Sequence, residues 1–552
     1  MAITLPSGTT LGAPVPGRGR SVLAARTFGP GSIIAEFNDT DNPIVAIPDN
    51  PRLATTCSYC LLSTTDPSLS DNSNNSNSKR VRACQGCQTS HYCSKQCQKA
   101  DWKMAHGQGE CKAFQVVRNS TQQPEHRILP TPTRALIQIL LRPALGEAVD
   151  KMEGHIQKVQ AARPGVMDRG TWDGYQLQGM AGLSYLGRAT TQDNLRTAAE
   201  YACKLQINSF NRADEDAGER GFYVNAALAM VNHSCVPNAF VRFTGRNAFL
   251  HAYREIEKGE EVTISYIEVT LPLSERQKEL KTRYHFECGC PRCISDLDVY
   301  EVCQKYPHLE LNSFSLVPDL DKLRNPPIKP FSGRLKRVVE DIYPICSPPL
   351  EPSGSAETKR QIGLRWKLCQ PLREAGLFAI DPVTQVFYEA STYFATKGNR
   401  AYSLALWCFI SLHNEPYIGP MPFHVPRMKS MLTTAKFFSV KFGAPSSGSS
   451  DLAKRIAGFI SEIDQATVCQ VIVTIVLHYV PMAHSKNWHV YRVAKALLDD
   501  IEKLPGRETE KALVNAFAQN LKGAEEARFF NTVVLEPLRK LADFALEIMD
   551  EL

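Results

Sequence analysis

The sequence predicts an α+β multidomain protein, in which a β-rich first half is followed by an all-α C-terminal region. Its 552 residues exceed what a single hydrophobic core usually serves, so two to four domains are expected. Short β-prone runs separated by glycine- and proline-containing turns occur before residue 57 and again between residues 239 and 266. Beyond residue 296 the apolar residues recur at helical spacing instead.

Composition places the chain among ordinary soluble globular proteins, with 43% hydrophobic and 22% charged residues. The net charge of +6 is spread over the whole length, so no direct nucleic-acid partner is expected. No signal peptide is visible at the N-terminus, and the apolar run 468–480 is too short to span a bilayer. We therefore expect a buried helix there, no membrane partner, a monomer, and a cytoplasmic or nuclear location.

The 17 cysteines fall into clusters, which in a reducing compartment indicate metal sites rather than disulfides. Seven lie within residues 57–111, and four more are Cys235, Cys288, Cys290 and Cys293. The others stand singly among apolar or mixed neighbours and are predicted to be small core residues. These six are Cys203, Cys303, Cys346, Cys369, Cys408 and Cys469.

Residues 57–111 have the ligand spacing of two zinc sites. The pairs are Cys57-x2-Cys60, Cys84-x2-Cys87, Cys93-x3-Cys97 and His106-x4-Cys111. Eight such ligands satisfy two tetrahedral ions, and little apolar content accompanies them, so metal is expected to supply most of the folding energy. The Ser- and Asn-rich insert 63–78 is predicted to be a disordered loop.

The remaining first half combines short strands with helices. Strands are predicted at 21–25, 32–37, 239–243, 249–252 and 260–266, and helices at 133–141, 195–207 and 273–284. Gly17-Arg18-Gly19 precedes the first strand; its glycines allow the backbone to approach a ligand, and Arg18 could meet a carboxylate. In the C-terminal half, helices are predicted at 361–372, 384–394, 401–412, 428–438 and, with breaks, 512–551.

A polar heptapeptide, Asn232-His233-Ser234-Cys235-Val236-Pro237-Asn238, follows the apolar run 226–231. Asparagine and histidine offer directed hydrogen bonds, and cysteine offers a soft metal ligand. A functional site is the preferred interpretation, because such a polar cluster is poor core material.

These motifs together carry a family resemblance. Residues 57–111, with Tyr92-Cys93 and Asp101-Trp102, resemble a MYND zinc finger. The heptapeptide, Gly259-Glu260-Glu261-x4-Tyr266 and Cys288-x-Cys290-x2-Cys293 resemble a SET domain with its post-SET zinc loop. The layout of residues 15–295 is similar to that of the SET and MYND domain-containing protein lysine methyltransferases.

The resemblance implies a division of the chain. Residues 1–56 and 208–272 would form a β-rich SET domain that is split by the MYND finger (57–111) and a helical insert (112–207). A post-SET zinc loop (273–295) and an all-α C-terminal domain (296–552) would follow. No clear 34-residue period emerges in the latter, so a tetratricopeptide-like arm over the substrate groove and a plain packing domain both stay open.

The resemblance also implies an activity, namely S-adenosylmethionine-dependent protein-lysine N-methylation of histone or other proteins that offer an accessible lysine. Its cofactor-binding residues would be Gly17, Arg18, Gly19, Asn208, Asn232, His233 and Phe286. Tyr266 and Tyr284 would be catalytic, with the tyrosine oxygens as neutral acceptors, while phenolate chemistry at Tyr266 stays open.

Three zinc ions are implied as well. Their ligand sets would be Cys57, Cys60, Cys93 and Cys97; Cys84, Cys87, His106 and Cys111; and Cys235, Cys288, Cys290 and Cys293. The MYND finger implies proline-containing peptide partners. The alternative function is a zinc-bearing adaptor that acts through the MYND and helical surfaces without catalysis. The sequence departs from the family at three places, namely the four residues between His106 and Cys111, Glu268 in place of aspartate, and Arg20 in place of leucine.

Overall fold

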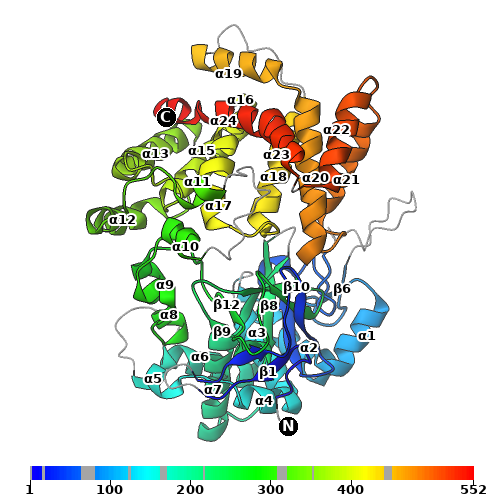
Figure 1. Cartoon of the computed structure of the whole chain (residues 1–552). Coiled ribbons are helices and arrows are strands. Elements are labelled where there is room, and N and C mark those ends of the chain that lie inside the picture. Colours follow the sequence, from blue (N-terminus) through cyan, green and yellow to red (C-terminus); the bar gives the residue numbers. More distant parts are fainter. Residues whose placement is uncertain are drawn as a thin grey trace. The chain divides into compact units, whose positions relative to one another are not determined.

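The computed structural model describes residues 3–14, 19–63, 81–121, 123, 126–161, 171–214, 218–306, 320–350, 354–440, 450–521 and 523–552. Two compact units emerge (Figure 1). The first unit contains residues 1–267 and 277–288, and the second contains residues 268–276 and 289–552. Gly17, Arg18 and nearly all of the predicted disordered insert lie outside the described residues.

The strands of the first unit form several small sheets. One has the order β10 (Ala239–Thr244), β11 (Asn247–Ala252), β3 (Ile33–Phe37), and another has the order β4 (Ile44–Pro48), β8 (Gly218–Asn225), β7 (Phe210–Asp214). All of these pairings are antiparallel. Two-stranded pairs are β1 (Thr9–Leu11) with β2 (Val22–Ala24), β5 (Arg82–Ala83) with β6 (His91–Tyr92), and the parallel pair β9 (Asn232–His233) with β12 (Thr263–Ile264).

The helices of the first unit lie mostly between β6 and β7. They are α1 (Lys95–Met104), α2 (Glu110–Arg118), α3 (Thr131–Leu141), α4 (Pro143–Asp150), α5 (Ile156–Ala161), α6 (Trp172–Tyr185) and α7 (Gln192–Asn208). Two of them confirm the helices predicted at 133–141 and 195–207. The helix predicted at 273–284 is confirmed as α8 (Leu273–Tyr284).

The strand predictions hold in part. The hairpin of β10 and β11 is confirmed, with Gly245 at the turn in a left-handed conformation (φ +55°). The long strand predicted at 260–266 is wrong, because only the two residues of β12 are regular. Residues 260–262 instead bridge to β2, since Ala24 N–H donates to the Glu260 carbonyl and Val262 N–H donates to the Val22 carbonyl, and β12 begins only at Thr263. Strands β4, β7 and β8 were not predicted.

An apolar core anchors the polar heptapeptide. Leu228 and Val231, from the run that precedes it, are buried with Leu250, Val262 and Ile264. The heptapeptide therefore starts at the edge of the core, and the burial of its apolar neighbours holds its polar groups in place.

The second unit is helical in its described residues and confirms the all-α expectation. Its helices are α9 (Pro291–Ile294), α10 (Val299–Lys305), α11 (Leu320–Arg324), α12 (Gly333–Cys346), α13 (Ser355–Leu368), α14 (Gln370–Arg373), α15 (Val383–Thr396), α16 (Arg400–Phe409), α17 (Glu415–Ile418), α18 (Val425–Phe438), α19 (Asp451–Glu462), α20 (Gln465–Ala483), α21 (His489–Glu502), α22 (Glu508–Gln519), α23 (Ala524–Phe530), α24 (Glu536–Ala542) and α25 (Ala545–Asp550). Single π-helical turns, η6 (Ile410–Asn414) and η7 (Asn531–Leu535), follow α16 and α23.

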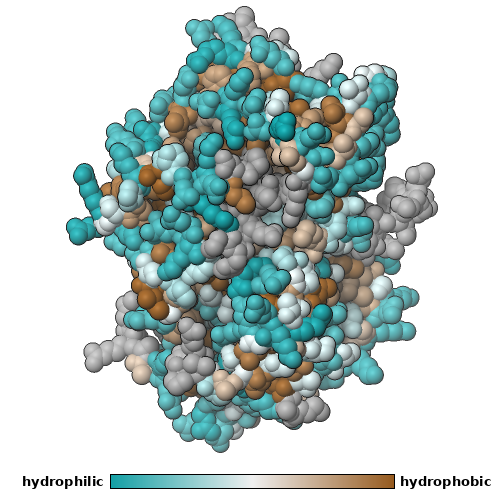
Figure 2. All heavy atoms as spheres, viewed as in Figure 1, coloured by the Kyte–Doolittle hydropathy of each residue, from teal (hydrophilic) through white to brown (hydrophobic). Residues whose placement is uncertain are grey.

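Helix α20 contains the apolar run that the sequence singled out. It is long and apolar enough to cross a membrane by length and composition. Its side chains at Val468, Val471, Ile472 and Val476 are nevertheless buried in the hydrophobic core of the second unit. The prediction of a buried helix is confirmed. Hydrophilic residues cover most of the molecular face drawn in Figure 2, with smaller hydrophobic patches among them.

Candidate active site and metal centres

The polar heptapeptide is tied at both ends to residues 261–264. Asn232 and His233 form β9, which pairs with β12. At the other end, the Asn238 Oδ1 atom accepts a 2.8 Å hydrogen bond from the Thr263 amide, and Asn238 Nδ2 donates to the Glu261 carbonyl at 2.8 Å. These bonds fix the backbone that leads into Tyr266.

Tyr266 is held by two hydrogen bonds. Its hydroxyl donates to the Val231 carbonyl at 2.6 Å, and its amide donates to His233 Nδ1 at 3.0 Å. Removal of the phenol from water, with a smaller contribution from nearby Tyr284, raises the pKa of Tyr266 above its ordinary value. The phenol is therefore neutral over the usual pH range, with its proton directed at Val231 and its oxygen lone pairs free to accept.

An aromatic cluster surrounds this hydroxyl. The ring centroids of Tyr266 and Tyr284 are 4.9 Å apart, and Phe286 stands edge-on to Tyr266 at 6.4 Å. Tyr284 also donates a 3.2 Å hydrogen bond to the Tyr266 carbonyl, and burial raises its pKa. The structure thus brings together Tyr266, Tyr284, His233 and Phe286, as the resemblance implied.

The imidazole of His233 contacts both the Tyr266 backbone and the Cys235 side chain. Because Nδ1 accepts from the Tyr266 amide, the neutral ring carries its proton on Nε2, which lies 3.3 Å from the Cys235 sulfur. Both ring nitrogens are thus used within the protein, so the side chain can position Tyr266 and Cys235.

Asn232 bridges two segments that are far apart in sequence. Its Nδ2 donates to the Arg20 carbonyl and to Glu261 Oε1, both at 2.8 Å. Gly19 next to Arg20 has φ +71°, which favours glycine over other residues. The end of the predicted Gly-Arg-Gly loop therefore lies beside the heptapeptide.

Sequence reasoning missed a group of polar residues near Asn208. Asn208 Nδ2 donates to the Glu153 carbonyl at 2.7 Å, and Lys158 Nζ donates to the His285 carbonyl at 3.1 Å. The rings of His155 and His285 are 6.3 Å apart, and both residues have positive φ, 45° and 59°. Strained residues of this kind cluster at functional sites.

The orphaned nitrogen of His285 adds to that indication. Its Nε2 is buried and has no hydrogen-bond partner among the described residues. The position of His285, between two aromatic residues with predicted roles, was the one signal in the sequence that could have found this group.

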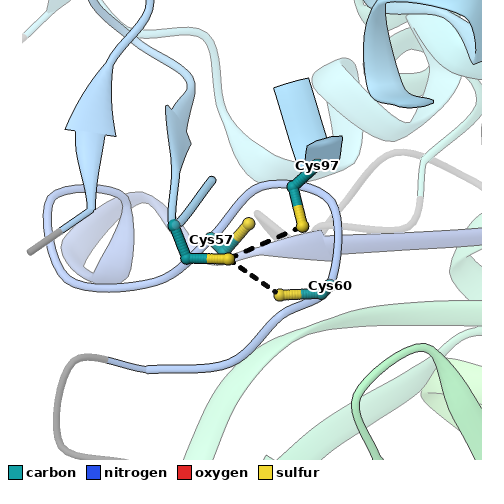
Figure 3. Close-up of side chains that lie close together, drawn as sticks. Cys57, Cys60 and Cys97 are labelled. Carbon is teal, nitrogen blue, oxygen red and sulfur yellow. Dashed lines mark hydrogen bonds between the residues drawn. The ribbon is translucent and has the colours of Figure 1, made fainter. Parts of the chain in front are cut away.

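The first predicted metal set is brought together. Cys57, Cys60, Cys93 and Cys97 place their sulfur atoms within 4.8 Å of one another. Figure 3 shows the side chains of Cys57, Cys60 and Cys97 pointing toward one another. Four converging thiols form the donor set of a structural zinc site.

The second set, Cys84, Cys87, His106 and Cys111, is fully buried and equally close. His106 Nε2 lies 3.6 Å from the Cys87 sulfur, while Nδ1 lies 2.9 Å from Glu110 Oε2. Such an outer carboxylate fixes the tautomer of a ligating histidine. The unusual spacing of His106 is accommodated by a 3₁₀ turn, His106–Gln108, followed by Gly109 at φ +147°.

The cysteines of the third set, Cys235, Cys288, Cys290 and Cys293, also have sulfur atoms within 4.8 Å of one another. Gln277 holds the backbone of Cys288 through two 2.8 Å hydrogen bonds. The Gln277 Nε2 atom donates to the Cys288 carbonyl, and the Cys288 amide donates to Gln277 Oε1. Three sites with zinc-type donors are therefore present among the described residues.

Comparison with known proteins agrees with this geometry. Residues 19–267 match the family model of the SET domain. The matched segment resembles a SET domain. It contains the heptapeptide, Gly19, Asn208 and Tyr266, and it spans both strand-rich segments and the cysteine-rich segment between them.

Relatives from several organisms match about half of the chain. SET domain and MYND-type zinc finger protein 6 of Schizosaccharomyces pombe is 32% identical over 282 residues, 50% of this chain and 51% of the relative. Histone-lysine N-methyltransferase ASHR1 of Arabidopsis thaliana is 28% identical, covering 50% and 54%. Human histone-lysine N-methyltransferase SMYD3 is 26% identical, covering 50% and 59%. The matches span about half of these relatives, and the predicted resemblance to SET and MYND proteins is confirmed.

Proposed function

We propose that the protein is an S-adenosylmethionine-dependent protein-lysine N-methyltransferase. The observation that carries the proposal is the Tyr266 hydroxyl, which is fixed on the Val231 carbonyl inside an aromatic cluster next to the Asn232-His233 strand of a SET domain. The names of two relatives, both histone-lysine N-methyltransferases, support the same reaction class.

The residues around Asn232 fit the chemistry of the cofactor. Asn232 uses its Nδ2 atom within the protein, so its Oδ1 atom is left to accept from an ammonium group. The unpartnered Nε2 of His285 and the Asn208 side chain offer further polar contacts. Phe286 would lie beside the adenine, and Gly17, Arg18 and Gly19 would approach the cofactor with their backbone.

Bound S-adenosylmethionine supplies an electrophilic methyl group on a cationic sulfur. The residues of the chain position a lysine amine in line with it, which accounts for much of the rate in such transfers. Tyr266 and Tyr284, kept neutral by burial, present oxygen lone pairs that stabilise positive charge at the transferring carbon. A phenolate is not required.

The zinc-type site that contains Cys235 and Cys288 supports this arrangement. Cys288 follows Tyr284 and Phe286 in the chain, and Cys235 contacts His233, which holds the Tyr266 amide. A metal bound there restrains both catalytic tyrosines through short stretches of backbone.

The MYND segment gives the enzyme an interaction surface. Trp102, on α1, is 51% exposed, although its neighbours Asp101 and His106 are buried. We infer that this face binds proline-containing peptides, because an exposed indole suits the flat rings of proline. The substrate is a protein with an accessible lysine.

Replacement of Tyr266 by phenylalanine tests the proposal. Tyr266→Phe removes one hydroxyl while keeping the ring, so methyl transfer should fall by about 100-fold or more. Calorimetry should still detect S-adenosylmethionine binding within a factor of about three, because the Asn232 contacts remain. Methyl transfer is measured as incorporation of labelled methyl into a protein mixture.

Tyr201→Phe is the matched control, since Tyr201 on α7 donates a 3.3 Å hydrogen bond to Asp150 far from Tyr266 in the sequence. It should keep full activity. Full activity in Tyr266→Phe would refute the assigned role. A parent protein that binds no S-adenosylmethionine would favour the adaptor function instead.

A further inference from the structure

A surface depression of about 380 Å³ lies in the second unit, where α19, α20, α22, α23, η7 and α24 converge. Its lining includes the apolar side chains of Phe459, Leu513, Phe529 and Val533, referred to below as the apolar floor. Leu513 is 48% exposed, although the next residue of α22, Val514, is buried in the core. Leu513 is thus exposed beside three half-buried apolar side chains, and apolar side chains gathered in one accessible hollow are typical of a binding surface.

The lining of the depression also carries acidic side chains. Glu462, Asp464, Glu510 and Glu536 contribute four carboxylates, and Lys540 is the one cation among the lining residues. The Lys540 ammonium lies 5.6 Å from the centroid of the Phe459 ring, over the apolar floor. The local charge is therefore negative, in a chain whose net charge is +6.

Only two of these four carboxylates have hydrogen-bonding partners among the residues that the structure describes. Asp464 caps α20 by accepting from the Thr467 amide at 3.1 Å, and Glu536 accepts from Asn531 at 3.3 Å. Within the described part of the chain, Glu462 and Glu510 make neither a hydrogen bond through their side chains nor an ion pair. These two carboxylates are available to an external cation.

The backbone of the depression is irregular at one side. Thr532 and Val533 belong to the π-helical turn η7, which inserts between α23 and α24. Single π-turns are rare and are frequently found at functional sites. Two residues of this turn therefore belong to the lining of the depression.

We propose that this depression binds a short segment of a partner protein in which an apolar side chain is flanked by lysine or arginine. The apolar floor would take the central side chain, and Glu462 and Glu510 would pair with the flanking cations. The inference does not depend on the proposed methyl transfer.

A partner segment suits the site better than a second copy of this chain. In a symmetric dimer the same patch meets itself, so the four carboxylates of one copy would face those of the other. A volume of about 380 Å³ also holds a few side chains rather than a domain surface.

Fluorescence anisotropy on the full-length protein tests the proposal with three labelled peptides. The probe has a central Leu-Phe pair flanked on each side by two lysines. One comparison peptide carries glutamate in place of each lysine, and the other carries serine in place of Leu-Phe. The probe should bind at least about tenfold more tightly than either, and more weakly as salt is raised.

Two variants locate the binding. The double charge reversal, Glu462→Lys with Glu510→Lys, should lower the affinity for the probe peptide by about tenfold or more and raise the affinity for the glutamate peptide. Leu513→Ser should lower the affinity for the probe peptide by about fivefold. It should leave α22 folded, since Leu513 is half exposed. Glu374→Lys, an exposed change elsewhere in the second unit, is the control and should bind the probe normally.

Several results would overturn the proposal. They are failure of the probe to bind at about 1 mM, equal binding of the glutamate peptide, or no change in the double reversal. Concentration-dependent dimerisation that is lost in Leu513→Ser would assign the surface to a second copy of the chain instead.

Discussion

The cysteine-rich segment 57–111 and the helical unit use the same side chain in opposite ways. In the segment, seven cysteines and His106 converge in two groups whose ligand atoms lie within 4.8 Å. In the helical unit, Cys408 and Cys469 are as fully buried as Cys57 and Cys87 but lie among apolar neighbours, away from any such group in the described residues. Burial alone does not distinguish a ligand from a core cysteine. What decides is whether the sulfur atoms converge.

The two regions also differ in what stabilises them. Among the described residues, the buried cluster around the finger is small and contains four cysteines and six other residues, among them Tyr92, Phe114 and Ile137. The helical unit has an extensive core that includes Phe387, Phe423 and Val476. The finger should therefore depend on metal, and the helical unit on hydrophobic burial.

Loss of one finger ligand should have the largest effect. Cys84→Ser should remove one zinc ion per chain and unfold the finger, since structural zinc contributes about 10 kcal/mol or more. Elemental analysis measures the metal, and proteolysis of residues 57–111 reports the unfolding. Cys408→Ser is the matched change in the helical core. It should keep all metal and cost about 1 to 3 kcal/mol for the buried hydroxyl. Equal zinc loss in Cys84→Ser and Cys408→Ser would contradict the distinction between ligand cysteines and core cysteines.

A carboxyl group of the helical core should give the next effect. Glu415 is buried, accepts from the Tyr388 hydroxyl at 3.2 Å, and has its pKa raised by burial to about 7. The folded state thus keeps a proton that the unfolded chain loses above its ordinary pKa of 4.5. The stability from this group is present below pH 4.5 and is lost as the pH rises to about 7, by about 2 to 3 kcal/mol.

Glu415→Gln should remove that pH dependence. Urea unfolding at about pH 5 and about pH 7.5 should show a smaller difference in the variant than in the parent. The finger should behave oppositely and gain stability as the pH rises, because its thiols must lose protons to bind zinc. Parallel pH profiles for parent and variant would contradict the role given to Glu415.

The smallest effect is expected from Glu110, which holds His106 from outside the second metal set. Glu110→Gln keeps an acceptor but removes the charge, so affinity for one zinc ion should fall by about tenfold. Competition with a chromophoric chelator measures this, and the ion on Cys57 should be unaffected. Glu200→Gln, on α7, provides the control. An unchanged zinc affinity in Glu110→Gln would show that the charge of Glu110 does not contribute to metal binding through His106.

Much of the fold could be read from local patterns. The finger ligands follow from pairs two or three residues apart, and α8 follows from an amphipathic run whose predicted bounds match its observed ones. Strands β7 and β8 were not predicted because β8 includes charged and glycine residues that break the usual strand pattern, and because one of its two pairing partners, β4, lies far away in the sequence. The helix predicted at 401–412 ends earlier, at Phe409, because η6 interrupts the regular winding.

The sequence by itself indicated the candidate metal ligands and the heptapeptide, because these depend on residue type and short spacing, and the family resemblance singled out Tyr266 and Tyr284. Only the tertiary structure placed Asn208 against Glu153, and Lys158 against His285, through contacts 55 and 127 residues apart. It also decided that Glu462, Glu510 and Leu513 surround one hollow. Such contacts between residues far apart in the sequence depend on how separate helices pack, and a local pattern of apolar and polar residues does not predict them.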